Sequence, residues 1–362
     1  MTENVYIHIP FCRQKCRYCS FVSYPELDKK EQYLSALKKE IKHGYRHEVL
    51  KTLYFGGGTP SLLRASEIAD LTGLFCIDKN TEITVELNPE AVTFEYLCEL
   101  KSAGVNRLSI GCQTFDDEKL AFIGRKHTSE DVIRVVNAAY KTGFENVSLD
   151  FIYGLPQQTV VGFERDLLKA VALGVQHISL YGLKIEEGCY FASHMPVNLP
   201  DQDLQADMYL KAIDILKSNG YGHYEMSNFA KPGFYSRHNL NYWDNNSYYG
   251  FGIAAHGYID GVRYSNLENF DDYFKTPYWH EAEHLETEEE ILEEEIFLGF
   301  RKMSGISVDK INKKFAIDFE KKYAAVLKKY LASGHIIKEN SRYKFTDQGI
   351  LVSNIILSEF LE

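Results

Sequence analysis

Short hydrophobic runs alternate with longer amphipathic stretches through the first 220 or so residues of the chain. The stretches between the runs carry apolar residues at helical spacing, as in Tyr33, Leu34, Leu37 and Ile41. Strands and helices in alternation are typical of a parallel sheet with right-handed crossovers. A complete barrel of this kind has eight units, so six units predict an α/β fold with a partial, open-sided (βα)6-type TIM barrel. The six strand-length runs lie at residues 5–9, 52–55, 82–87, 106–110, 147–152 and 177–181.

The pattern changes twice after this region. Residues 226–285 are rich in aromatic residues, Gly and Asn, and we expect them to close the open side of the barrel around a pocket. Residues 286–362 begin with an acidic, amphipathic helix and continue with further helices and a short hairpin. They predict a small, mainly helical C-terminal domain of the winged-helix kind. Residues 1–225 form the partial barrel in this division.

Composition and charge argue against some classes of function. The chain has 362 residues, of which 45% are hydrophobic, and this fraction predicts a sizeable core. The formal charge of −11 argues against nucleic acid as a partner, because phosphate binding needs a surplus of Lys and Arg. We find neither a secretory signal nor a run of about 18–20 apolar residues, so we expect a cytoplasmic protein without an integral membrane segment.

Three of the seven cysteines are clustered directly after the first predicted strand. Cys12, Cys16 and Cys19 have the spacing C-x3-C-x2-C, and each can supply a thiolate for a soft metal. Three thiolates can hold three irons of a four-iron cluster and leave the fourth iron open. Two alternatives are a structural zinc site with a fourth ligand such as His8, and ordinary buried cysteines. The other four cysteines stand singly, which favours a buried structural role.

Polar residues recur where the predicted strands end. Three glycines and Thr59 follow the second strand, in a loop whose backbone N–H groups a ligand can approach closely, although a flexible turn explains them equally well. Glu86 lies near the end of the third strand and should have a cationic or amide partner, such as a structural Arg or, if the site is functional, a ligand amine. Gln113 comes shortly after the fourth strand, and Asp150 lies inside the fifth. Strand ends of a parallel α/β fold converge on one mouth, where we expect the site.

These motifs resemble those of a known superfamily. C-x3-C-x2-C with the aromatic Tyr18 before the third cysteine resembles the signature of the radical S-adenosylmethionine (SAM) superfamily, and FGGGTP resembles its motif for the SAM amino group. The chain is similar over nearly its whole length to the oxygen-independent coproporphyrinogen III oxidase family of porphyrin biosynthesis. The matching segments are VYIHIPFC, FGGGTPS, VELNPE, RLSIGCQTF, GRKH, DFIYGLPQQT and the C-terminal domain.

The resemblance implies a role for individual positions. Cys12, Cys16 and Cys19 would bind a [4Fe–4S] cluster, and the amine and carboxylate of SAM would chelate its open iron. An electron donor such as a flavodoxin or ferredoxin would reduce the cluster, and cleavage of SAM would give a 5′-deoxyadenosyl radical. The positions that match SAM contacts of the family are Tyr6, Tyr18, Gly57, Gly58, Thr59, Glu86, Gln113, Arg125 and Asp150.

Two features separate the chain from the oxidases. The oxidases carry a fourth cysteine two residues after the third, where this chain has Phe21. The run His238-Asn-Leu-Asn-Tyr-Trp243 resembles the shorter HemW-type heme chaperones, which bind heme and deliver it to respiratory proteins. We therefore predict a heme chaperone on a radical SAM scaffold, with His238 as the first candidate for heme contact and His256 as another. The alternative is an enzyme that converts coproporphyrinogen III to protoporphyrinogen IX by radical decarboxylation.

Overall fold

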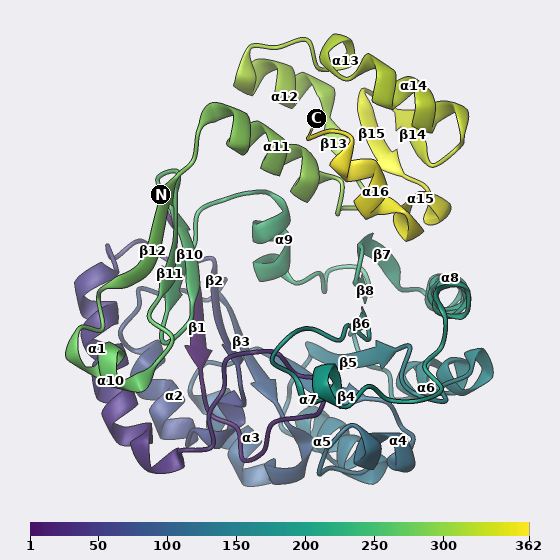
Figure 1. The fold of residues 1–362 in the computed structure, drawn as a ribbon. Helices are drawn as coiled ribbons and strands as arrows, with labels where there is room; N and C mark the ends of the chain where they lie inside the picture. The colour runs from purple at the N-terminus through teal and green to yellow at the C-terminus, as the bar shows by residue number, and fades with distance from the viewer. Residues whose placement is uncertain (362) are drawn as a thin grey trace.

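The structure, a computed structural model, describes residues 1–361 and is built on a curved nine-stranded sheet (Figure 1). Its strand order is β7-β8-β6-β5-β4-β3-β2-β1-β9, and β1 to β6 are parallel neighbours in chain order. This arrangement confirms the predicted partial barrel. The parallel strands are β1 (Asn4–Ile9), β2 (Thr52–Gly57), β3 (Glu82–Leu87), β4 (Arg107–Gln113), β5 (Val147–Tyr153) and β6 (His177–Gly182).

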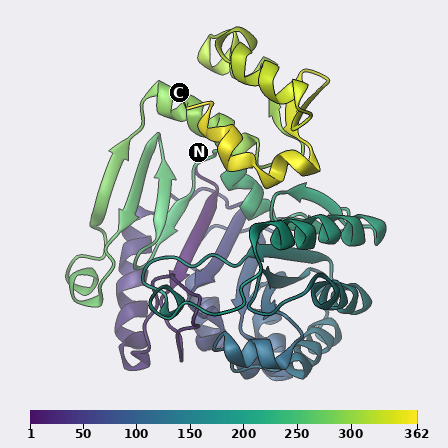
Figure 2. The ribbon, with the colours of Figure 1, turned by 45° about the vertical axis from the view of Figure 1, so that its right-hand side comes forward.

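Helices that follow the strands cover the outer face of this sheet (Figures 1 and 2). Helix α5 shows why they form: Thr128 caps its first turn in a capping box with Asp131, and an apolar stripe that includes Val132 and Val136 is buried. The helices are α1 (Lys30–Gly44), α2 (Ala65–Thr72), α3 (Phe94–Ser102), α4 (Asp117–Phe122), α5 (Ser129–Lys141), α6 (Val160–Ala172), α7 (Tyr190–Ser193) and α8 (Gln202–Ser218), with 3-10 turns at Leu27–Lys29, Pro60–Leu62 and Pro89–Ala91.

The segment after α8 lengthens both edges of the sheet. On one side β8 pairs antiparallel with β6, and on the other β9 pairs parallel with β1. A separate three-stranded antiparallel sheet follows, beside β1 and α1 in Figure 2. These elements are β7 (Gly222–Glu225), β8 (Asn228–Ala230), α9 (Arg237–Trp243), β9 (Tyr249–Phe251), β10 (His256–Ile259), β11 (Val262–Asn266), α10 (Phe270–Lys275) and β12 (His280–Leu285).

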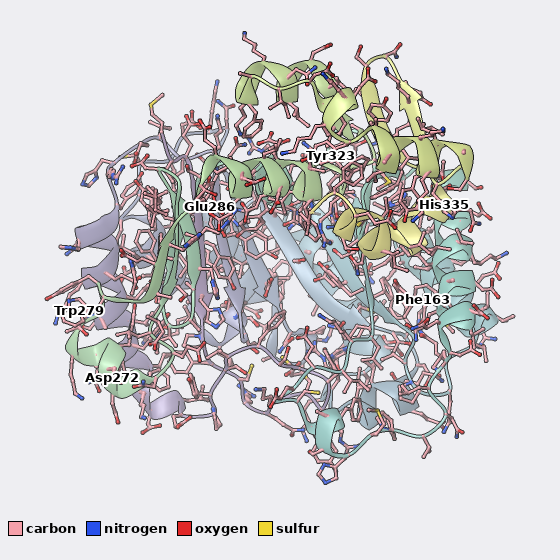
Figure 3. The ribbon with its side chains drawn as sticks, turned by 45° about the horizontal axis from the view of Figure 1, so that its top comes forward. Phe163, Asp272, Trp279, Glu286, Tyr323 and His335 are labelled. Atoms are coloured by element: carbon pink, nitrogen blue, oxygen red, sulfur yellow. The ribbon has the colours of Figure 1, made fainter. Side chains whose placement is uncertain are left out.

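The C-terminal region is a helical domain with a small sheet of order β13-β15-β14, placed over the amino-terminal ends of the barrel strands (Figure 1). Figure 3 looks from this end and shows Tyr323 and His335 in the domain. The backbone N–H of Met226 donates to the Arg301 carbonyl oxygen at 3.0 Å, and this hydrogen bond joins the C-terminal domain to the barrel. Its elements are α11 (Glu288–Gly299), β13 (Ile306–Ser307), α12 (Val308–Phe315), α13 (Phe319–Lys322), α14 (Ala324–Ala332), β14 (Ile336–Glu339), β15 (Arg342–Phe345), α15 (Asp347–Leu351) and α16 (Ser353–Ser358).

Among the residues that the structure describes, no helix has both the length and the apolar character needed to cross a bilayer.

One buried carboxylate ties α1 to the segment that follows α8. Glu40 accepts hydrogen bonds from Asn266 Nδ2 at 2.6 Å, from the Gly252 N–H at 2.9 Å and from the Tyr273 hydroxyl. Burial raises its pKa to about 8. We expect Glu40→Ala to lower the free energy of unfolding by about 3 kcal/mol, because three buried donors lose their acceptor. Urea denaturation measures this loss; the exposed Glu31→Ala on the same helix is the control, and a loss that matches the control contradicts the prediction.

Candidate functional site

The loop between β1 and α1 carries the three clustered cysteines and is fixed by its backbone. The Cys12 N–H donates to Tyr24 at 3.0 Å and the Tyr24 N–H donates to Pro10 at 2.7 Å, which closes the base of the loop. The Arg17 N–H donates to Ile123 at 3.0 Å and ties the loop to the end of α4. All three cysteines are free thiols and half-buried. These hydrogen bonds hold the three cysteines near the carboxyl ends of the strands.

A cavity of about 530 Å³ lies at this end of the barrel, bounded by the cysteine loop and the strand ends. Its volume is in the range of ordinary ligand sites. Of the fourteen residues named from the sequence for the cluster, SAM and heme, eleven line it, and Tyr6, His238 and His256 do not. The eleven are Cys12, Cys16, Tyr18, Cys19, Gly57, Gly58, Thr59, Glu86, Gln113, Arg125 and Asp150.

The donor set at the cysteines fits an iron–sulfur cluster. Arg125 Nη1 donates to Cys16 Sγ at 3.7 Å, and the Thr59 hydroxyl lies 3.4 Å from Cys12 Sγ. A guanidinium and a hydroxyl beside sulfur favour the thiolate that a metal binds. Among residues 1–361, no three Cys, His, Asp or Glu side chains converge on a point for a single ion, so the fit rests on the chemistry of the three thiols.

The structure does not supply the histidine ligand that a zinc site would take from β1. His8 Nε2 lies 2.8 Å from the Val22 carbonyl oxygen, and its Nδ1 lies 3.2 Å from the Tyr6 hydroxyl. Burial lowers the pKa of His8 to about 4, so the ring is neutral. Both nitrogens are therefore occupied in hydrogen bonds, and the three thiols stand without His8 as a partner.

The glycine loop after β2 passes tightly beside the cysteine loop. The Gly58 N–H donates to Ile9 at 2.8 Å, and a Cβ on Gly58 would lie 2.6 Å from the Phe11 carbonyl oxygen. Gly57 has φ +106°, and a Cβ there would lie 2.7 Å from the His8 ring. A side chain at either position would collide with its neighbour. The loop is thus a packed cradle that brings backbone to the cavity, and the interpretation as a flexible turn is wrong.

Two half-buried carboxylates, those of Glu86 and Asp150, line the same cavity. Glu86 Oε1 accepts from the Tyr54 hydroxyl at 2.8 Å, and Asp150 Oδ2 accepts from the Ser109 hydroxyl at 2.9 Å. Burial raises the pKa of Glu86 to about 7, the charge of Asp150 adds to this, and burial also raises the pKa of Asp150.

Neither carboxylate has a cation of the chain as a direct partner. Within residues 1–361, neither Glu86 nor Asp150 lies within 4.0 Å of a Lys, Arg or His nitrogen. Arg107, which is buried, acts on Glu86 only at longer range. Half-buried carboxylates without a direct cationic partner favour a cationic ligand. A ligand amine as the partner of Glu86 stays a prediction.

Arg125 joins the strand ends to the cysteines. Its Nη2 donates to Asn88 Oδ1 at 2.7 Å and to the Gly111 carbonyl oxygen at 2.8 Å, while Nη1 faces Cys16. Gln113 has φ +66° at an irregularity in the pairing of β4 with β5, which re-aims the end of the strand. The guanidinium thus places one positive charge beside Cys16 at the wall of the cavity.

Sequence reasoning missed several residues that line the cavity, among them Tyr54, Asn88 and Ser109. Asn88 directly follows β3, so the strand-end rule that selected Glu86 applied to it as well. Tyr54 and Ser109 lie inside strands, where a period of two tells which residues share a face but not which face is the interior. The pairing of β1 with β2 supplies that information, because Tyr6 and Tyr54 are opposite each other and their rings stack at 6.1 Å.

His238 lies at the other end of the barrel from the cysteines. Its Nδ1 is 2.7 Å from the hydroxyl of Thr52, the first residue of β2, and its Nε2 is 2.8 Å from the Tyr242 hydroxyl. The side chain is buried and its ring stacks on Tyr54. His256, by contrast, is exposed at the start of β10. Both nitrogens of His238 are thus engaged within the chain, and its contact with heme stays a prediction.

Two substitutions separate a heme ligand from a structural histidine at position 238. We expect His238→Ala to cost about 2 kcal/mol of unfolding free energy, because the hydroxyls of Thr52 and Tyr242 lose their partner. Tyr242→Phe instead frees Nε2 while keeping the ring. If His238 binds heme iron, the Soret maximum shifts in the Ala variant and persists in the Phe variant. Heme titration of folded, cluster-loaded protein gives the answer, and equal spectra for all three proteins contradict the prediction of heme contact.

Comparisons with known proteins identify two matching family models and relatives that match over 99% of the chain. The model of the Radical SAM superfamily matches residues 6–170, and the HemN C-terminal domain matches residues 287–352. The chain is 38% identical to Heme chaperone HemW of Lactococcus lactis subsp. lactis, across 99% of this chain and 97% of that protein. It is also 38% identical to Heme chaperone HemW of Bacillus subtilis, across 99% of each.

Among solved structures, the chain is similar to coproporphyrinogen III oxidase (HemN) from Escherichia coli, a radical SAM enzyme. The two superpose with a TM-score of 0.87 at 23% identity, over 99% of this chain and 89% of the other. At that identity the likeness shows the shared fold alone.

Proposed function

The chain belongs to the heme chaperone HemW family of the radical SAM superfamily, and we propose from this premise that it binds heme and delivers it to acceptor proteins. The observation that carries the proposal is the continuous likeness to heme chaperones through the barrel and the C-terminal domain. Phe21 supports the proposal. It is 66% exposed and lines the cavity. At this position the resemblance to the oxidases would imply a fourth cysteine, which this chain lacks.

Cys12, Cys16 and Cys19 would hold the [4Fe–4S] cluster, with Arg125 and Thr59 stabilising two of the thiolates. A cluster held in this way, with SAM on it, supplies one-electron chemistry. Two features of the cavity support a cationic ligand with an amine: the carboxyl groups of Glu86 and Asp150 line it, and the Gly57–Gly58 backbone allows close approach. Tyr18 and Gln113 line the same cavity. Tyr6 does not line the cavity, and it would contribute by stacking on Tyr54, which does.

The proposal extends to partners and organisation. The acceptors would be heme-binding respiratory proteins, and the electron donor a flavodoxin or ferredoxin. We place the protein in the cytoplasm, where such carriers and acceptor domains are accessible. Residues 1–225 would form the cofactor-binding barrel, 226–285 the segment that closes it, and 286–362 an accessory domain. Heme is cargo in this scheme and not a resident cofactor.

The test is a direct comparison of heme handling with porphyrinogen chemistry. Cluster-loaded protein is titrated with heme under anaerobic conditions and then mixed with an apo-cytochrome acceptor. We expect a stoichiometric Soret band and its transfer to the acceptor. The same preparation with SAM, reductant and coproporphyrinogen III should yield no protoporphyrinogen IX above a control without protein. Catalytic formation of protoporphyrinogen IX, or the absence of heme binding, would contradict the proposal.

A further inference from the structure

A buried arginine lies inside the barrel, beneath the large cavity. Arg107 is the first residue of β4 and is 1% exposed. Within residues 1–361, its Nε has no hydrogen-bond partner and its guanidinium forms no ion pair with Asp or Glu. Arginine keeps its proton in proteins, and a buried cation without a direct partner destabilises the fold. Packing alone therefore does not explain a charged side chain at this position.

The pairing of the strands places Arg107 below the two carboxylates that line the cavity. Side chains alternate along a strand, so Arg107 lies on the same face of β4 as Ser109, which lines the cavity. Ser109 is opposite Glu86 in the register of β3 with β4, and its hydroxyl donates to Asp150 Oδ2 at 2.9 Å. Arg107 comes two residues earlier, which is about 7 Å along the strand. The cation therefore lies one layer beneath Glu86 and Asp150 and is not in direct contact with them.

The other cations of the cavity are engaged elsewhere or exposed to solvent. Arg125 faces Cys16 and donates to groups at the ends of β3 and β4. Lys184 has 80% of its side chain exposed, and Lys15 is exposed on the cysteine loop. Water and salt screen exposed charges, whereas a charge in the interior acts over a longer distance. Arg107 is therefore the cation whose field reaches the carboxylates through the interior of the barrel.

The groups around the two carboxylates leave Arg107 as the charge that opposes their burial. Burial raises the pKa of Glu86 and of Asp150, and the charge of Arg107 lowers both. The neighbouring tyrosines are neutral, because burial raises the pKa of each above its ordinary value. They are Tyr6 on β1, Tyr54 on β2, Tyr181 on β6 and Tyr242 on α9.

Arg107 has only one charged neighbour on its other side. Glu82 lies at the start of β3, where it accepts from the N–H groups of Arg237 and His238. Burial raises the pKa of the nearby Tyr224 on β7, and it lowers the pKa of His177 on β6 and of His238. These three side chains are therefore neutral, and the guanidinium lies between Glu82 on one side and the carboxylates of the cavity on the other.

We propose that Arg107 is a positioning residue for a ligand amine, because its charge keeps the carboxylates of Glu86 and Asp150 ionised without occupying the place of the amine. The inference rests on the proposed function in that it takes the large cavity to bind the amine of SAM. An ammonium group is attracted to an ionised carboxylate far more strongly than to a protonated one. A cation in direct contact would compete with the ligand, whereas a cation one layer below stabilises the ionised form and leaves the contact open.

The test compares two neutral replacements with one that keeps the charge. In Arg107→Gln and Arg107→Met we expect Glu86 and Asp150 to take up protons about one pH unit higher than in the parent chain. Arg107→Lys should restore the parent behaviour, because a charge that acts at a distance does not need the shape of a guanidinium. Arg165→Gln, which removes an exposed cation of α6, is the matched control. Methionine has no polar group to leave unpaired, so it serves where the Gln variant does not fold.

Two measurements on the full-length protein read the effect. Infrared difference spectra of the ligand-free protein between about pH 5 and pH 9 follow the bands of protonated carboxyl groups, and the bands lost in Glu86→Gln and Asp150→Asn assign them. Calorimetric titration of cluster-loaded protein with SAM gives the affinity. Both neutral variants should bind SAM about tenfold more weakly than the parent at pH 7 and at least as tightly at about pH 9, where both carboxylates are ionised in every variant.

Each outcome decides the proposal. An upward shift of the carboxyl titration in the neutral variants, reversed by lysine, supports it. An unchanged titration, a shift that lysine does not reverse, an equal shift in Arg165→Gln, or a loss of SAM affinity that is the same at every pH overturns it. Failure of both neutral variants to fold also overturns it, because the fold then needs the cation for its own stability.

The two readouts separate this proposal from the proposed function. The infrared titration needs no ligand, so it reports on Arg107 even in a preparation that binds neither SAM nor heme. An unshifted titration together with a Soret band on heme addition removes the role of Arg107 and keeps the chaperone. A shifted, lysine-reversible titration without heme binding supports the role of Arg107 and removes the chaperone alone.

Discussion

Cys16→Ser is expected to yield a folded protein that cannot be loaded with iron and sulfide. The backbone of the cysteine loop is held by the Cys12–Tyr24 and Arg17–Ile123 hydrogen bonds and needs no thiol for its shape. A serine hydroxyl is a hard ligand with a high pKa, whereas cluster iron is bound by thiolates. We expect the iron content after anaerobic reconstitution to fall from about four per chain to below about one. The brown absorbance should disappear while the circular dichroism spectrum stays unchanged.

Two matched controls make this result specific. Cys76→Ser and Cys98→Ser also replace half-buried free thiols, yet neither residue lines the cavity, and both variants should load iron like the parent chain. Cys12→Ser and Cys19→Ser should behave like Cys16→Ser, because each thiolate would bind a different iron of the proposed cluster. Zinc in stoichiometric amount in the parent protein, or normal iron loading of Cys16→Ser, would refute the assignment of the three cysteines.

The residues of the site that lie near strand ends could be predicted from the sequence. Glu86, Gln113 and Asp150 follow apolar runs whose ends converge in any parallel barrel, so their meeting did not depend on details of packing. The six-unit count rested on the same periodicity, and the first six strands are neighbours in chain order.

The rest depended on contacts between distant segments that a sequence pattern does not encode. His238 stands in an aromatic-rich stretch that resembles a pocket lining, yet α9 begins where Glu82 accepts from the N–H groups of Arg237 and His238, at the amino-terminal end of β3. That contact spans about 155 residues and places the helix at the far end of the barrel. The strand β9 could not be predicted either. Its three residues are too few for a periodic pattern, and it is a strand because it pairs with the edge of β1.

Glu86→Gln should weaken SAM binding and, in the unliganded protein, raise stability. In the unliganded site burial raises the pKa of Glu86 to about 7, above its ordinary value. The folded chain therefore holds the proton more tightly than the unfolded chain, and the contribution of Glu86 to stability declines as the pH rises through about 7. Glutamine still accepts from the Tyr54 hydroxyl but carries no charge to desolvate. We expect the variant to melt at a higher temperature than the parent at pH 8, with the difference vanishing near pH 5.

Ligand binding should respond in the opposite direction, because a cationic amine favours the ionised carboxylate. We expect the affinity of the parent chain for SAM to rise with pH up to about 8, and Glu86→Gln to lower it about tenfold there and much less near pH 5.5. Calorimetric titration of cluster-loaded protein measures the affinities, and thermal unfolding measures the stabilities. Glu90→Gln is the control, because Glu90 does not line the cavity that contains Glu86. A purely structural Glu86 predicts that both quantities fall together in the variant, so opposite signs at pH 8 identify a carboxylate that the fold keeps for a cation it does not itself contain.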